Sequence, residues 1–115
     1  DVRFPELALQ LRTQGANILT VPAAFTHTTG QMHWQLLLQA RAMDSQCQVL
    51  GAAQHGWHCE GKRQTWGHAM ATQSQGKILA EVTDAGNQLI VVPFDVEEQF
   101  NIRQAMPLMQ HRKLM

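Results

Sequence analysis

Residues 17–34, NILTVPAAFTHTTGQMHW, constrain the fold more than any other part of the sequence. Their apolar, β-branched start ILTV predicts a buried strand. Pro22 is expected to end its ladder, because proline has no N–H to donate. A loop of small and hydroxyl side chains follows at 23–30, and a helix is predicted from about Gln31. Strand, polar loop and helix in this order is the arrangement in which α/β proteins bind ligands at the carboxyl ends of strands.

The loop at 23–30 offers one aromatic side chain and several hydroxyl groups, from Phe25, Thr26, Thr28 and Thr29. Two interpretations stay open. The loop is either an ordinary connection in which Thr28 or Thr29 caps the helix, or a binding loop that presents these side chains to a ligand.

Composition narrows the class of protein. A chain of 115 residues with 44% hydrophobic residues fits one small domain with a core. Nine basic and nine acidic residues, without a polybasic run, indicate neither a nucleic-acid partner nor a membrane surface. No apolar run approaches the roughly 20 residues that span a bilayer. Cys47 and Cys59 give no disulfide framework, which favours a reducing, cytoplasmic location.

The rest of the chain alternates between helical and extended patterns. The predicted elements are a helix at 3–15, the strand at 18–21, a helix at 31–45, a strand at 47–54, a loop at 55–67, a hairpin at 67–82, a turn at 83–87, a strand at 88–94 and a helix at 96–107. This order predicts half of a layered α/β sandwich with a mixed sheet. Arg41 interrupts the apolar stripe of the 31–45 helix, and we expect it to form a structural ion pair.

Clusters of reactive side chains are sparse. His55, His58 and Cys59, with His68 nearby, suggest a metal site, but HxxHC has neither the CxxC nor the HExxH spacing of zinc sites, so no metal is expected. Cys47 lies in an apolar strand, where cysteine behaves as a small hydrophobe. Cys59 has no evident base beside it. The residues alone therefore indicate no complete catalytic machinery.

A series of motifs over the whole chain resembles the nitrilase (carbon–nitrogen hydrolase) superfamily. The most specific is the opening Arg3-Phe4-Pro5-Glu6-Leu7. The others are Pro22-Ala23-Ala24-Phe25-Thr26, Thr29-Gly30 with His33-Trp34, Ala40-Arg41-Ala42, Gly67-His68, Pro107 and Gln110-His111-Arg112. The stretch from Gln46-Cys47 to Ala52-Ala53-Gln54 is most similar to the branch of deaminated glutathione amidases, and the ω-amidase branch shares much of the rest.

This resemblance implies a four-layer αββα sandwich, of which residues 1–115 are expected to form the C-terminal half within a single domain. Enzymes of the superfamily usually form dimers and use a Cys nucleophile, two Glu and one Lys. All four are expected upstream of Asp1, so no catalytic residue is expected within this sequence, and the chain alone is expected to be inactive. No cofactor or metal is implied.

The resemblance also assigns a substrate side to this chain. Arg3, Phe25 and Thr29 match positions that bind the carboxylate of short α-keto acid amides. A guanidinium pairs with a carboxylate in a planar, bidentate manner. The alternative for Arg3 is an ion pair with Glu6 one helical turn away.

The implied reaction is hydrolysis of an amide through a Cys thioester, with Glu as general base and with Lys and a backbone N–H stabilising the oxyanion. Deaminated glutathione would give 2-oxoglutarate and cysteinylglycine, while an ω-amidase would act on 2-oxoglutaramate. Because these substrates differ in their leaving groups, residues 55–66 are the expected discriminator between them. A third possibility is a truncated, non-catalytic interaction module that exposes its sheet.

Overall fold

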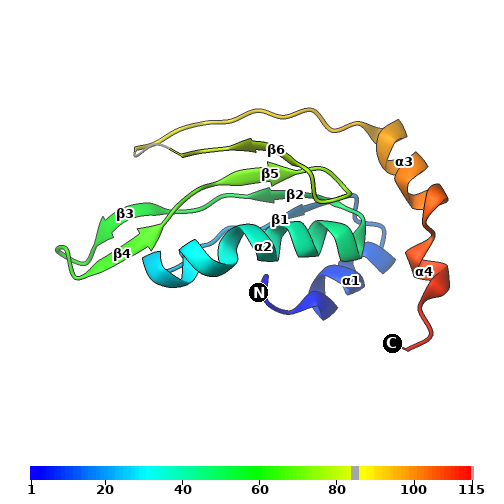
Figure 1. Ribbon diagram of the computed structural model, residues 1–115, viewed down its shortest axis with the longest axis horizontal. Coiled ribbons are helices and arrows are strands. Elements are labelled where there is room, and N and C mark those ends of the chain that lie inside the picture. Colours follow the sequence, from blue (N-terminus) through cyan, green and yellow to red (C-terminus); the bar gives the residue numbers. More distant parts are fainter. Residues whose placement is uncertain (84–85, 115) are drawn as a thin grey trace.

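The computed structural model describes residues 1–83 and 86–114. A mixed four-stranded sheet forms its centre, with strands in the order β1-β2-β5-β6 (Figure 1). Its members are β1 (Ile18–Thr20), β2 (Gln48–Gly51), β5 (Met70–Thr72) and β6 (Ile78–Glu81). β1 runs parallel to β2, whereas β2 with β5 and β5 with β6 are antiparallel. The prediction of an α/β fold with a mixed sheet is therefore confirmed.

Two helices pack together beside this sheet, α1 (Pro5–Thr13) and α2 (His27–Ser45). α1 has Pro5 at its first position and Gln14 as its C-cap, and it is followed by Gly15, whose φ of +106° suits the residue after a helix cap. α2 begins earlier than the predicted Gln31, at His27, and its N-cap is Thr26. The expectation that Thr28 or Thr29 caps the helix is wrong, because both residues lie inside its first turn.

The core lies between α2 and the sheet. Trp34, Leu38 and Ala42 recur along one face of α2 and are fully buried. Val49 of β2 and Met70 of β5 meet them from the sheet. β2 comes so close to α2 that a Cβ on Gly51 would lie 2.7 Å from Leu38 Cδ1. The position of α2 on the sheet is therefore fixed by tight packing.

The segment predicted as a loop at 55–67 is instead a two-stranded hairpin. β3 (His55–His58) pairs with β4 (Arg63–Trp66), and the hairpin projects at one end of the molecule (Figure 1). Cys59, Glu60 and Gly61 all have positive φ and form its turn. The loop prediction failed because glycine and histidine are poor signals for a strand, while cross-strand pairing stabilises one regardless of composition.

Two further predictions need correction. Residues 88–94 are extended, but no ladder includes them among the described residues, and Leu89 is 89% exposed. Their Pro93 lacks the N–H that a ladder needs. The strand predicted as buried, β1, has only Leu19 buried, because β1 lies at the edge of the sheet. Of the predicted turn at 83–87, Asp84 and Ala85 lie outside the described residues.

The C-terminal helices, α3 (Val96–Ala105) and α4 (Leu108–His111), lie at the end of the molecule opposite the hairpin (Figure 1). The side chain of Asp95 caps α3, accepting from Glu98 N at 2.9 Å. Gln99 is the only buried residue of α3, and its Nε2 donates to Asn17 O and Ser74 Oγ, each at 2.8 Å. Polar contacts therefore hold this helix. No helix in the described part of the chain is long and apolar enough to cross a membrane.

Candidate functional site

The backbone after β1 is held from two sides. The β1–β2 ladder ends before Pro22, at the pair Thr20 and Leu50, as expected. Beyond Pro22 an isolated bridge forms, in which Ala23 N donates to Ala52 O and Gln54 N donates to Ala23 O, both at 2.9 Å. On the other side, Trp66 N of β4 donates to Phe25 O at 2.9 Å. The loop that carries Phe25 is thus fixed between β2 and the hairpin, as a preorganised binding loop requires.

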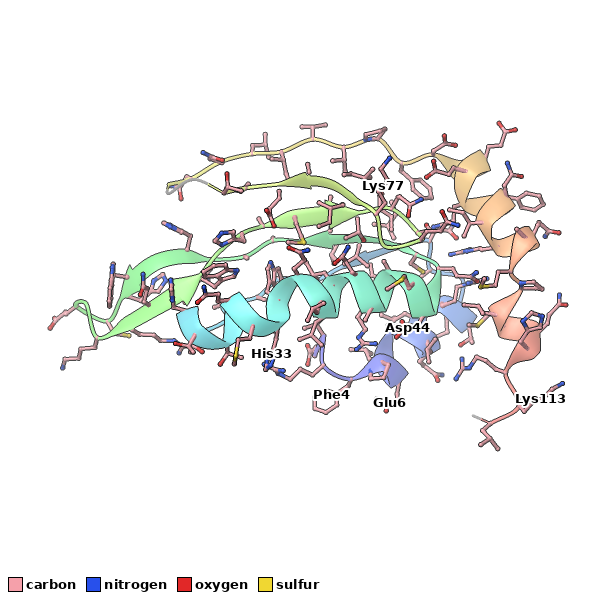
Figure 2. The ribbon with its side chains drawn as sticks, in the orientation of Figure 1. Phe4, Glu6, His33, Asp44, Lys77 and Lys113 are labelled. Carbon is pink, nitrogen blue, oxygen red and sulfur yellow. The ribbon has the colours of Figure 1, made fainter. Side chains whose placement is uncertain are left out.

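Arg3 and Phe25, which the sequence assigns to one site, lie together in the structure. The guanidinium carbon of Arg3 is 5.2 Å from the centroid of the Phe25 ring, within the range of a cation–π contact. Phe25 in turn packs against Trp34, with ring centroids 5.1 Å apart. Arg3 Nη1 also lies 3.4 Å from Nδ1 of His33, which Figure 2 labels on α2. Because the Arg3 guanidinium keeps other N–H groups, it can still pair with an anion.

The structure also places Thr29 and Glu6, the other two residues that the sequence analysis connects with Arg3. Thr29 lies in the first turn of α2, one turn before His33, and makes no hydrogen bond with Arg3 among the described residues. Within the same residues, no ion pair joins Arg3 to Glu6. In Figure 2, Glu6 points away from His33. The Arg3–Glu6 alternative is therefore not what the structure contains.

A large cavity opens next to this loop, at the carboxyl ends of β1 and β2. Its volume is about 780 Å³, and its lining includes Ala23, Ala53, Gln54, His55, His58 and His68. We call it the histidine cavity. Arg3, Phe25 and Thr29 do not line it, but Pro22 and Ala23 line both it and a smaller cavity of about 150 Å³ that includes Phe25. The two cavities are therefore neighbours.

The histidines of this region do not form a metal centre. Among residues 1–83 and 86–114, no group of three or more His, Cys, Asp or Glu could hold a metal ion. His58 Nε2 is instead 2.8 Å from Thr65 Oγ1, and His68 Nδ1 is 2.9 Å from Trp66 O. Cys59 is exposed, while Cys47 is fully buried and donates to Ala16 O at 3.3 Å. The buried position of Cys47 agrees with its expected role as a small hydrophobe.

Arg41 forms the ion pair that the sequence predicts. Its Nη1 contacts Asp44 Oδ2, and its Nε donates to Val2 O at 2.7 Å, which ties the N-terminal turn to α2. Burial raises the pKa of Asp44 above its ordinary value, and the nearby Arg41 only partly offsets this. Asp44 Oδ1 is buried without a hydrogen-bond partner among the described residues, which is consistent with the cost of burying this carboxylate.

Comparison with known proteins shows which family shares the sequence motifs of this chain. Residues 1–104 match the carbon–nitrogen hydrolase family. The chain belongs to this family. A deaminated glutathione amidase of Yersinia enterocolitica is 48% identical over 113 residues, which is 98% of this chain and 39% of that protein. The carbon–nitrogen hydrolase resemblance inferred from the motifs is therefore confirmed.

Solved structures agree with the carbon–nitrogen hydrolase fold. The NitFhit protein of C. elegans superimposes with a TM-score of 0.88 at 40% identity, covering 98% of this chain and 27% of that one. Nit3 of Saccharomyces cerevisiae is described as a member of branch 10 of the nitrilase superfamily. It superimposes with a TM-score of 0.89 at 35% identity, covering 99% of this chain and 41% of that one. The chain thus spans about two-fifths or less of the length of these relatives.

Sequence reasoning missed two parts of the site. His33 was noted only as part of a motif, although its spacing of four residues from Thr29 places both on one face of α2. The histidine cavity was missed because the 55–67 segment was interpreted as a loop. The sequence HGWH has no apolar–polar alternation that would indicate a strand, and the alternation of exposed and half-buried residues along β3 is visible only in the structure.

Proposed function

We propose that residues 1–115 form the part of a carbon–nitrogen hydrolase that binds the carboxylate of an α-keto acid amide. The observation that carries this proposal is the position of Arg3, whose guanidinium lies over the Phe25 ring without a carboxylate partner among the described residues. A guanidinium fixed in this way is preorganised for a planar, bidentate pair with a carboxylate. Thr29, on the adjacent turn of α2, supplies a hydroxyl donor in this proposal.

We propose that the complete enzyme is an amidase that hydrolyses deaminated glutathione to 2-oxoglutarate and cysteinylglycine. Its support is the deaminated glutathione amidases among the relatives, including those of Yersinia enterocolitica and Mus musculus. In this proposal the Cys nucleophile, the Glu residues and the Lys are contributed from outside residues 1–115, and a thioester forms and is hydrolysed. An ω-amidase acting on 2-oxoglutaramate is the alternative, because both substrates present the same α-keto carboxylate to Arg3.

The test uses the full-length protein that contains these residues. Arg3→Lys keeps a positive charge but loses the bidentate geometry, and Arg3→Met removes the charge. We expect kcat/KM for both α-keto amides to fall about 10-fold for Arg3→Lys and about 100-fold for Arg3→Met, because hydrogen bonds to charged groups are worth about 1.5–3 kcal/mol. Arg112→Lys in the C-terminal tail is the matched control. Hydrolysis at the wild-type rate by Arg3→Met would exclude Arg3 from the site.

We also propose that the complete enzyme is a cytoplasmic homodimer. The location is supported by two free cysteines, Cys47 and Cys59. The dimer is supported by apolar side chains that α1 and α2 leave exposed, among them Leu7, Met32 and Leu36. A homodimer that packs helix layer on helix layer would bury them.

A further inference from the structure

We propose that the histidine cavity is the subsite for the leaving half of the substrate, where it binds the carboxylate of a dipeptide that ends in glycine. This inference rests on the proposed amidase function and assigns a role to residues outside the Arg3 site. It follows from the position of the cavity, from the chemistry of its lining and from the fixed orientation of His68.

The place of the cavity suits the second half of a substrate whose first half lies at Arg3. Pro22 and Ala23 line the histidine cavity on one side and the smaller cavity that includes Phe25 on the other. Both cavities therefore border one loop at the carboxyl edge of the sheet, where α/β folds place their ligands. An acyl group held by Arg3 and Phe25 would direct its amide substituent along this loop.

The lining of the cavity favours a polar ligand with a negative charge. Among the described residues, the lining includes three histidines and the amide side chains of Gln54, Asn87 and Gln88. The three amide side chains and the exposed His55 can each supply an N–H donor to a carboxylate. A volume of about 780 Å³ is ample for a dipeptide, and it is far larger than ammonia requires.

His68 is held in one orientation. Because the Trp66 carbonyl can only accept, His68 Nδ1 must donate the 2.9 Å hydrogen bond between them. The imidazole also stacks on the Trp66 ring, with centroids 3.9 Å apart and planes 11° from parallel. Its Nε2 is consequently the ring atom that makes no hydrogen bond among the described residues. His55 is exposed, with no ring hydrogen bond among the described residues, so its N–H can turn toward a ligand.

The discriminating experiment compares two substrates in the full-length protein. His55→Ala is combined with His68→Asn, because asparagine tolerates the positive φ of residue 68 and can still donate to the Trp66 carbonyl. We expect kcat/KM for deaminated glutathione to fall about 10-fold, mainly through KM, while the value for 2-oxoglutaramate changes less than about twofold. His111→Ala on α4 is the control. An equal loss on both substrates indicates a structural role, and no loss on either excludes the subsite; both results overturn the proposal.

A binding measurement separates this inference from the proposed reaction. Cysteinylglycine and its C-terminal amide are titrated into the wild-type protein and the double variant, with histidine ring signals followed by NMR. We expect the acid to bind about 10-fold more tightly than the amide in the wild type only. If neither α-keto amide is hydrolysed but this preference is found, the proposed reaction fails and the subsite stands. Equal affinity for acid and amide in the wild type overturns the subsite whatever the activity.

Discussion

Arg41, which pairs with the partly buried Asp44, joins the N-terminal turn to α2. Because burial raises the pKa of Asp44, the folded protein holds this proton more tightly than the unfolded chain does. The contribution of Asp44 to stability is therefore fully present below the ordinary aspartate pKa of about 3.9, and it is lost as the pH rises through the raised value.

We predict that Asp44→Asn removes this part of the pH dependence, because an amide does not titrate. The free energy of unfolding, measured by urea denaturation at a series of pH values from about 3 upward, should fall less steeply with rising pH in the variant than in the wild type. Glu60→Gln, at the exposed hairpin turn, is the control. Identical slopes for wild type and Asp44→Asn would show that Asp44 does not carry the effect.

At the level of elements, the contact between α2 and the hairpin depends on the absence of one side chain. A Cβ on Gly30 would lie 2.3 Å from Trp66 Cβ, a distance that no real structure tolerates without movement. Helix propensity alone predicts that alanine stabilises this position by about 1 kcal/mol. The close contact with Trp66 predicts instead that alanine at this position destabilises the protein.

We predict that Gly30→Ala destabilises the protein by about 1–3 kcal/mol, because the hairpin must move away from α2. Thermal unfolding of Gly30→Ala and of Gln31→Ala, an exposed neighbour on the same helix, measures the difference. A melting temperature for Gly30→Ala at or above that of the wild type would mean that the hairpin is not packed as described.

Elements with strong local signals were predicted from the sequence, and those that depend on distant contacts were not. The helices predicted at 3–15 and 96–107 are present as α1 and α3, with Pro5, Gly15 and Asp95 at their ends, because capping is a local effect. The β3–β4 hairpin was missed because its stability depends on pairing between strands. At the site, Arg3 and Phe25, which the resemblance assigns to one pocket, lie close together, but the contact with His33 depends on how the N-terminal turn packs on α2.

The whole molecule is elongated for its length. Its radius of gyration is 15.0 Å, with extents of 49 × 30 × 21 Å, whereas a compact chain of 115 residues would have about 13 Å. The projecting hairpin and the extended segment at 88–94 account for this shape (Figure 1). Large apolar side chains are exposed on two surfaces, at Leu36 of α2 (66%) and at Leu89 and Val91 (89% and 86%).

We predict that residues 1–115 on their own self-associate, because exposed apolar surface of this kind is rare on monomers. Light scattering behind size exclusion, over a range of concentrations, measures the mass. Leu36→Glu should reduce association if the helix layer is the interface, and Leu89→Glu should do so if the 88–94 segment is. A concentration-independent monomer with cooperative unfolding would contradict both the homodimer proposal and the interaction-module alternative.

The stacked Trp66–His68 pair has an optical consequence. Of the three tryptophans, Trp34 is fully buried and Trp57 is 65% exposed, and only Trp66 lies face to face with an imidazole. An imidazole stacked on an indole at such short range alters the emission of that indole. The intrinsic fluorescence of this protein should therefore change when the two rings are separated. Trp66 fluorescence can therefore report on the environment of His68 in the wall of the histidine cavity without an attached dye.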